Sequence, residues 1–261
     1  MAESIHAKDD FESPKRHNAP KKSVVNSVLT RVVSAGNSLL SLLTGLLAAV
    51  LILYSGYVLY DTFYIQNNAA SSSFELLQHK PEIIEEGAVP LAGEGKVDAI
   101  AENYRAWLTM YGSNIDYPVM QGTDDLYYAS HDIYDQISLT GAIYVAAANN
   151  STFSDSYNLV YGHHMDNGAM FGGLDAYKNQ SYFNANREGL LVTNSGVFDL
   201  RTFAVLTTDA YENEIYTVGD RMDDVLAFLR AHRTAPDAKS ETLILDESAL
   251  NGATKIVALS T

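Results

Sequence analysis

The 261-residue sequence has no cysteine, only six prolines and no charged residue between Val32 and Tyr60. The lack of cysteine excludes a disulfide framework, and in an exported domain it favours a Gram-positive type of surface protein over a eukaryotic ectodomain. Scarce proline and an ordinary content of 17 glycines exclude a collagen-like or globally disordered chain. The sequence therefore predicts a folded protein, with about two hundred residues available for one domain that has its own core.

The uncharged stretch predicts a transmembrane helix over residues 32–60. Leu, Ala, Val, Ile and Tyr dominate it from Leu39 onward, and it exceeds the roughly 20 apolar residues that cross a bilayer as a helix. Tyr54, Tyr57 and Tyr60 lie where an interfacial aromatic belt is expected. A cleaved signal peptide is the alternative, but its apolar region is only about 7 to 15 residues long.

Charge on the two sides of this segment predicts its orientation. Residues 1–31 form a basic tail, in which the cluster Lys15, Arg16, Lys21, Lys22 and Arg31 contains no acidic residue. Basic flanks stay in the cytoplasm, so we expect a single-pass protein of the cell membrane with its main domain extracellular. Beyond Tyr60 lie 28 of the 32 acidic residues and 11 of the 17 basic ones, so this part is a poor partner for nucleic acid.

The remaining chain is predicted as an extracellular stalk, residues 61–96, and one domain, residues 97–261. The stalk has a short helix at 74–78, and a longer helix is predicted over residues 97–111 because Tyr104, Trp107, Leu108 and Tyr111 recur at three- and four-residue spacings. Short apolar runs at 141–147, 157–161 and 255–261 predict strands.

A hairpin and one further helix complete the pattern. Residues 190–193 and 197–207 alternate around Asn194-Ser195-Gly196, which predicts a β-hairpin, and residues 221–232 have one apolar face, which predicts a helix. Many short strands with few helices indicate a mainly β fold, a barrel or sandwich with helical insertions.

The most informative segment for chemistry is Asn158–Gly173, where a strand ending at Tyr161 is followed by Gly162, His163 and His164. A histidine at a strand end can serve as a general acid and base, because imidazole exchanges protons near neutral pH. Two other interpretations stay open at this point. Adjacent histidines can be hydrogen-bonded loop residues, or they can bind a metal, although no other histidine or cysteine has the spacing of a ligand set.

From about Val97 to Thr261 the chain resembles the class B branch of the sortases. Four ordered segments carry this resemblance: Ile115–Gln121 followed by Tyr127-Tyr128 and His131-Asp132, then Thr140–Tyr144, Tyr161–Met165 and Gly168–Gly172. The helix at 221–232 lies where class B sortases have a helix between their sixth and seventh strands. The resemblance implies a sortase-type β-barrel with helical insertions, preceded here by one N-terminal transmembrane helix.

The resemblance also implies a cysteine transpeptidase that cleaves sorting signals and transfers the protein to an amine of the cell wall or of a pilin. His163 matches the family histidine and would protonate the leaving amine and then deprotonate the incoming one. Tyr161, Leu259, Ser260 and Thr261 are expected to contact the substrate. We expect His163 to lie on the rim of a groove, close to the main chain of Ser260 and Thr261. Neither a cofactor nor a metal is implied.

The C-terminal residues differ from the family pattern. The family motif Thr-Leu-x-Thr-Cys aligns with Ala258-Leu259-Ser260-Thr261, after which the sequence ends before the cysteine and before the strand that carries the family arginine. We therefore expect a truncated sortase domain without transpeptidase activity as the sequence stands. The alternatives are a catalytically dead, membrane-anchored remnant or binding module and, more remotely, a metal-dependent hydrolase that uses His163 and His164.

Overall fold

The computed structural model describes residues 24–81, 100 and 102–261. The chain divides into two compact units, residues 1–59 and 60–261. The long helix α1, Val24–Leu76, begins in the first unit and continues into the second, where the 3₁₀ helix η1, Leu77–His79, follows it. The parts of the predicted stalk and of the predicted 97–111 helix that fall on residues 82–99 and 101 lie outside the described residues.

Helix α1 contains the predicted transmembrane segment. The stretch Val24–Ile65 is long and apolar enough to cross a bilayer, with a mean hydropathy of 2.1, and none of its most apolar window is buried. An N-terminal signal sequence would satisfy the same criteria. The protein therefore has one N-terminal helix that could serve as a membrane anchor.

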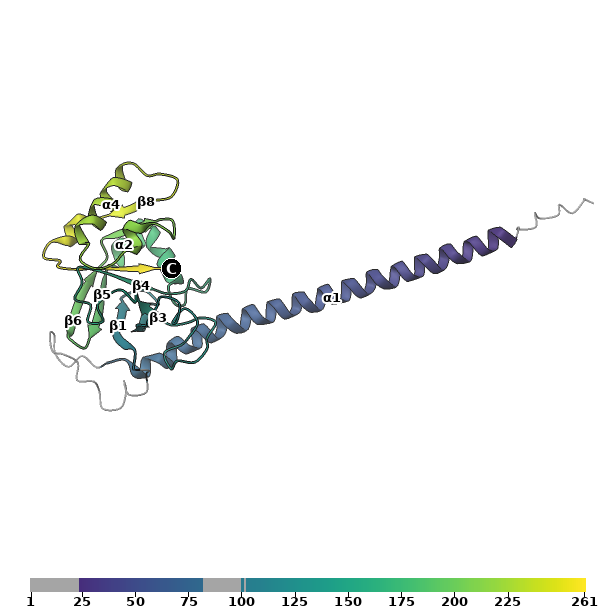
Figure 1. The fold of residues 1–261 in the computed structure, drawn as a ribbon, viewed down its shortest axis with the longest axis horizontal. Coiled ribbons are helices and arrows are strands. Elements are labelled where there is room, and N and C mark those ends of the chain that lie inside the picture. Colours follow the sequence, from purple (N-terminus) through teal and green to yellow (C-terminus); the bar gives the residue numbers. More distant parts are fainter. Residues whose placement is uncertain (1–23, 82–99, 101) are drawn as a thin grey trace, which may run out of the picture. The chain divides into compact units, whose positions relative to one another are not determined.

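A curled, mixed seven-stranded sheet forms the centre of the second unit (Figure 1). The strand order is β6-β5-β1-β2-β3-β4-β9, in which the β2–β3 and β4–β9 pairs are parallel and the other pairs antiparallel. The strands are β1 Tyr104–Met110, β2 Asp116–Met120, β3 Ile143–Val145, β4 Tyr157–Tyr161, β5 Glu188–Thr193, β6 Gly196–Arg201 and β9 Ile256–Ser260.

A smaller layer lies beside this sheet. Its two strands pair antiparallel, and helix α4 packs on them, as Figure 1 shows at one end of the unit. The remaining elements are η2 Gly172–Lys178, α2 Gln180–Ala185, β7 Ala204–Thr207, α3 Asn213–Tyr216, α4 Met222–Thr234, β8 Glu241–Leu245 and η3 Glu247–Leu250. Buried Val225, Leu226 and Leu229 on α4 join Tyr157 and Ile256 in one apolar cluster, which fixes the helix against the start of β4 and β9.

Most predicted elements are present. Strand β4 has the predicted bounds, β3 and β9 lie inside the predicted runs, and α4 begins one residue after the predicted helix and ends two residues beyond it. The hairpin is β5–β6, in which Thr193 pairs with Gly196. The segment predicted as its second strand, residues 197–207, forms two strands, β6 and β7. The chain leaves the large sheet after Arg201, and β7 pairs with β8 instead. The mainly β fold with helical insertions is thus confirmed.

The predicted helix over residues 97–111 is wrong where the structure describes it, because Tyr104–Met110 is strand β1. This strand lies between β2 and β5, and its residues from Ala106 to Met110 are all buried. A strand buried on both faces shows no alternation of apolar and polar residues, so its apolar positions matched a helical spacing by coincidence. Trp107 is a core residue, with none of its surface exposed.

Candidate functional site

His163 lies just beyond the end of β4, on the exposed surface. Strand β4 runs parallel to β9, with Tyr161 opposite Ser260, and the Gly162 amide donates to the Ser260 carbonyl at 3.0 Å. The ladder therefore brings the residue before His163 into contact with a segment almost a hundred positions away. The residue before His163 thus contacts the Ser260 main chain, whereas the rim of a groove, the closeness of His163 itself to Ser260 and Thr261 and its catalytic role stay predictions.

Gly162 is required for this close packing. A Cβ at this position would lie 2.4 Å from Cδ1 of Ile143 and 2.8 Å from the Phe171 ring. The Phe171 amide donates to the His163 carbonyl at 3.0 Å, and Phe171 itself is fully buried. The backbone of His163 is thus held by a core residue, while its side chain points out of the core.

The two adjacent histidines have different partners. Nε2 of His163 lies 2.8 Å from the Ala129 carbonyl, and Nε2 of His164 lies 2.7 Å from a carboxylate oxygen of Asp175. Lys178 and His164 hold the pKa of Asp175 below its usual value by hydrogen bonding to its ionised form, Lys178 having the larger effect. Within the described part of the chain, no three histidine or acidic side chains are grouped as metal ligands.

Three tyrosines from separate elements line up beside the end of β4. The Tyr161 ring lies 5.3 Å from that of Tyr144 on β3 and 6.4 Å from that of Tyr216 on α3, to which it is nearly parallel. Burial, with a smaller contribution from Asp125, raises the pKa of Tyr144 to about 12, and the same two causes raise that of Tyr161. Both hydroxyls are therefore neutral at physiological pH, and that of Tyr144 donates its proton to the Asp125 carbonyl at 2.8 Å.

The predicted substrate-contacting residues at the C-terminal end, two on β9 and Thr261 just beyond it, have different surroundings. Leu259 is partly buried and packs against the main core, whereas the Ser260 hydroxyl lies 3.3 Å from that of Tyr216 and Thr261 is exposed. Alternation along the strand explains why the Leu259 and Ser260 side chains point to opposite faces. Contact of these residues with a substrate stays a prediction.

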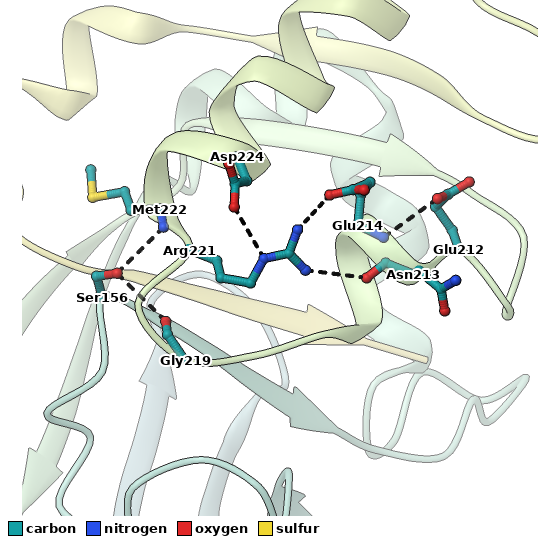
Figure 2. Close-up of polar contacts among 8 residues, drawn as sticks. All are labelled: Ser156, Glu212, Asn213, Glu214, Gly219, Arg221, Met222 and Asp224. Atoms are coloured by element: carbon teal, nitrogen blue, oxygen red, sulfur yellow. Dashed lines mark hydrogen bonds and ion pairs between the residues drawn. The ribbon is translucent and has the colours of Figure 1, made fainter.

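An arginine holds the short helix that presents Tyr216. Figure 2 shows the Arg221 guanidinium between two carboxylates, donating to Asp224 at 3.2 Å and also to Glu214, and reaching the Asn213 carbonyl at 3.5 Å. Asp224 belongs to α4, whereas Glu214 and Asn213 belong to α3. The interaction therefore couples the two helices, and a four-residue helix that would not be stable alone is kept in place.

The same segment is attached to the beginning of β4. Ser156 accepts a hydrogen bond from the Met222 amide at 3.3 Å, and its hydroxyl lies 3.5 Å from the Gly219 carbonyl (Figure 2). The Tyr157 amide donates to the Gly219 carbonyl at 2.9 Å, and the Tyr157 hydroxyl donates to Ile215 at 2.8 Å. His163 thus follows the end of strand β4, whereas the start of the same strand anchors the segment that bears Tyr216.

Sequence reasoning missed Ala129 and Tyr216 as parts of this region. Tyr144 was included in a family-like segment but given no role. Ala129 acts through its carbonyl, which every residue type has, and Tyr216 is brought in by tertiary contacts from a helix without a sequence signal of its own. No local pattern could have found either residue.

Comparison with known proteins gives related sequences and folds, although no protein-family model matches the chain. It is 28% identical to sortase B of Listeria monocytogenes over 157 residues, 59% of this chain and 61% of that protein. That alignment spans less than two thirds of the Listeria protein. Sortase B of Staphylococcus aureus is 24% identical over 220 residues, 83% of this chain and 86% of that protein.

Solved structures agree with these sequence relatives. A Bacillus anthracis protein similar to sortase B has the same fold, with a TM-score of 0.60, 22% identity and coverage of 76% of this chain and 91% of that one. A Streptococcus pyogenes class B sortase involved in pilus biogenesis matches with a TM-score of 0.56 and 30% identity, covering 63% of this chain and 86% of that one. On this identity, coverage and shared fold, the chain belongs to the class B branch of the sortase family.

Proposed function

We propose that this chain is a membrane-anchored class B sortase in which His163 is the acid and base of a peptide-transfer reaction. The substrate is a protein with a C-terminal sorting signal, and the acceptor is an amine of the cell wall or of a pilin. The observation that carries the proposal is the exposed imidazole beyond β4, which directly follows the Gly162 amide bonded to Ser260 and the row of three tyrosines centred on Tyr161.

In this reaction a thiolate attacks the backbone carbonyl of the sorting signal and the peptide C–N bond breaks. The leaving nitrogen keeps the bonding electrons and takes a proton from His163. The incoming amine then attacks the thioester, gives a proton to His163 and releases the thiolate. None of the 261 residues is a cysteine, so we expect no thioester chemistry from a polypeptide of this sequence alone.

The proposed localisation uses residues 32–60 as a single membrane anchor, residues 1–31 as a cytoplasmic tail and residues 61–96 as a stalk below the domain 97–261. The positive charge before the span and the acidic domain after it support this orientation. Protease added to intact protoplasts should degrade the domain. Protection of the domain from the protease would mean that the orientation is reversed.

Peptide binding to the chain itself tests the site. The isotope-labelled protein in detergent is titrated with synthetic sorting-signal peptides from surface proteins of the four Gram-positive organisms named above. We expect one peptide class to shift the resonances of Tyr161, His163 and Ser260, with His232 on α4 as the unaffected control. If no peptide shifts these three residues, or if His232 shifts equally, the proposed groove is wrong.

Chemistry is tested by extending the chain beyond Thr261 with the cysteine and last strand of the Streptococcus pyogenes class B sortase. The extended protein should cleave the peptide that binds, and His163→Ala in it should lower the rate by roughly 10²-fold or more, as for a lost general acid and base. Full activity of the His163→Ala variant would contradict the proposed role. Binding without cleavage would indicate a peptide-binding module instead of a transpeptidase.

A further inference from the structure

The hydrogen bond to the His163 ring identifies which of its nitrogens carries the proton. Nε2 lies 2.8 Å from the carbonyl oxygen of Ala129. A carbonyl oxygen can only accept a hydrogen bond, so Nε2 must be the donor. A neutral imidazole has a single N–H, which leaves Nδ1 as the unprotonated nitrogen.

We propose that the Ala129 carbonyl is a positioning group, which fixes His163 as the Nε2–H tautomer and makes Nδ1 the atom that exchanges protons with the substrate. The mechanistic half of this inference rests on the proposed function, whereas the tautomer does not. In the imidazolium form, the proton on Nδ1 is transferred to the leaving amine nitrogen, while the Nε2–H group stays hydrogen-bonded to the Ala129 carbonyl. In the second half of the reaction, Nδ1 takes the proton of the incoming amine, so the ring never has to turn over.

The Ala129 carbonyl can do this because its own position is fixed. The Tyr128 carbonyl accepts from the Ala142 amide at 2.9 Å, and the Ser130 carbonyl accepts from the Ser138 amide at 2.9 Å. The segment is therefore bonded, on both sides of Ala129, to residues 138–142, which lead into β3. Tyr128 is fully buried, and its hydroxyl donates to Asp135 at 2.7 Å. A well-held acceptor of this kind restrains the ring that donates to it.

Gly141 sets how closely these segments approach. Its φ is +58°, and a Cβ there would lie 2.4 Å from the Tyr128 carbonyl oxygen and 2.8 Å from the Ala129 carbonyl oxygen. A side chain at this position would have to push the carbonyl that His163 uses. Gly252 is a matched control, because its φ of +81° is also positive but nothing lies within 4 Å of a Cβ placed on it.

Other histidines of the chain provide internal standards. Nδ1 of His131 lies 2.9 Å from the Tyr127 carbonyl, and Nδ1 of His232 lies 3.0 Å from the Phe228 carbonyl. By the same reasoning the His131 ring is an Nδ1–H tautomer, the opposite of His163. Nε2 of His232 also lies 3.6 Å from a carboxylate oxygen of Asp237, so the Phe228 carbonyl alone does not fix the tautomer of that ring. His164 donates from Nε2 to Asp175 and belongs with His163. One spectrum therefore contains both forms.

The test is long-range ¹H–¹⁵N correlation of the ¹⁵N-histidine-labelled full chain in detergent at about pH 8.5, roughly two units above the ordinary imidazole pKa. Loss of signals in His163→Gln and His131→Gln assigns the rings. We expect an unprotonated Nδ1 and a protonated Nε2 for His163, and the reverse for His131. An Nδ1–H tautomer, or an exchange-averaged ring, at His163 would overturn the proposal.

Substitution tests the cause of the preference. Gly141→Ala should move the His163 signals toward the averaged position, whereas Gly252→Ala should leave them unchanged. A folded Gly141→Ala protein with an unchanged Nε2–H signal would show that the carbonyl does not select the tautomer. If Gly141→Ala does not fold, the tautomer measured for His163 in the wild-type protein decides whether the proposal holds. None of these measurements needs a nucleophile, so their failure is distinct from failure of the peptide-binding and cleavage tests.

Discussion

The carboxylate of Asp116 and the imidazole of His163 are both polar groups at the ends of strands, but they have different surroundings. Asp116 accepts from Lys80 at 2.8 Å, from the buried Trp107 indole at 2.6 Å and from the Thr109 hydroxyl at 2.8 Å. Among the described residues, the His163 ring makes a single hydrogen bond. The Asp116 carboxylate is surrounded by donors, as expected of a structural polar cluster. The His163 ring uses only Nε2, so Nδ1 is available to a ligand, as expected of a binding or catalytic site.

The largest expected effect comes from breaking the filled cluster. Asp116→Ala leaves the Trp107 and Thr109 donors without an acceptor, although these residues are 0% and 8% exposed. We expect the free energy of unfolding in detergent to fall by about 2 to 4 kcal/mol in urea titrations, as for buried donors that lose their partner. Asp199→Ala on β6 is the exposed control and should change it by less than about 0.5 kcal/mol. Equal effects of the two substitutions would show that the cluster is not structural.

A second polar cluster, around Asp246, allows the contribution of such a cluster to stability to be measured as a function of pH. Asp246 accepts from Ser248 and from the Arg187 guanidinium, and these bonds, with Ser248 contributing most, lower the pKa of Asp246 to about 2. A carboxyl group whose pKa is lower in the folded than in the unfolded state stabilises the protein at pH values above its unfolded-state pKa. This stabilisation is lost as the pH falls through the folded-state pKa.

Asp246→Asn should therefore lower the melting temperature at neutral pH and flatten its decline between about pH 4 and pH 2. Thermal unfolding across that range is the measurement, with Asp199→Asn as the control that should keep the wild-type slope. If the melting temperature of Asp246→Asn declines with acid as steeply as that of the wild type, other carboxylates account for the acid sensitivity. Asp175 and Asp237, whose pKa values are also lowered, are the candidates.

The smallest expected effect on stability is at the candidate site. His163→Ala removes an exposed ring with one hydrogen bond, so the free energy of unfolding should change by less than about 0.5 kcal/mol. The urea titration used for Asp116→Ala gives this value under the same conditions. A loss above about 1.5 kcal/mol would place His163 with the structural clusters and remove the contrast between the two regions.

The sequence alone located the histidine but not its surroundings. Strand β4 was predicted with its correct bounds, because a short apolar run followed by glycine is a local signal. The resemblance to class B sortases rested on segments that are also local, and it is confirmed by the relatives. By contrast, the Ala129 carbonyl is 34 positions from His163, and Tyr216 is 44 positions from Ser260.

What the sequence by itself determined are the features with a local physical cause: the apolar N-terminal helix, the β5–β6 hairpin, the amphipathic α4 and the strand that ends before His163. Tertiary structure decided the rest. Strand β1 is a strand because β2 and β5 supply its hydrogen bonds, although its apolar spacing fits a helix. The tautomer of His163 is likewise set by a carbonyl on another segment, since a neutral imidazole has no strong preference of its own until an acceptor is placed beside one nitrogen.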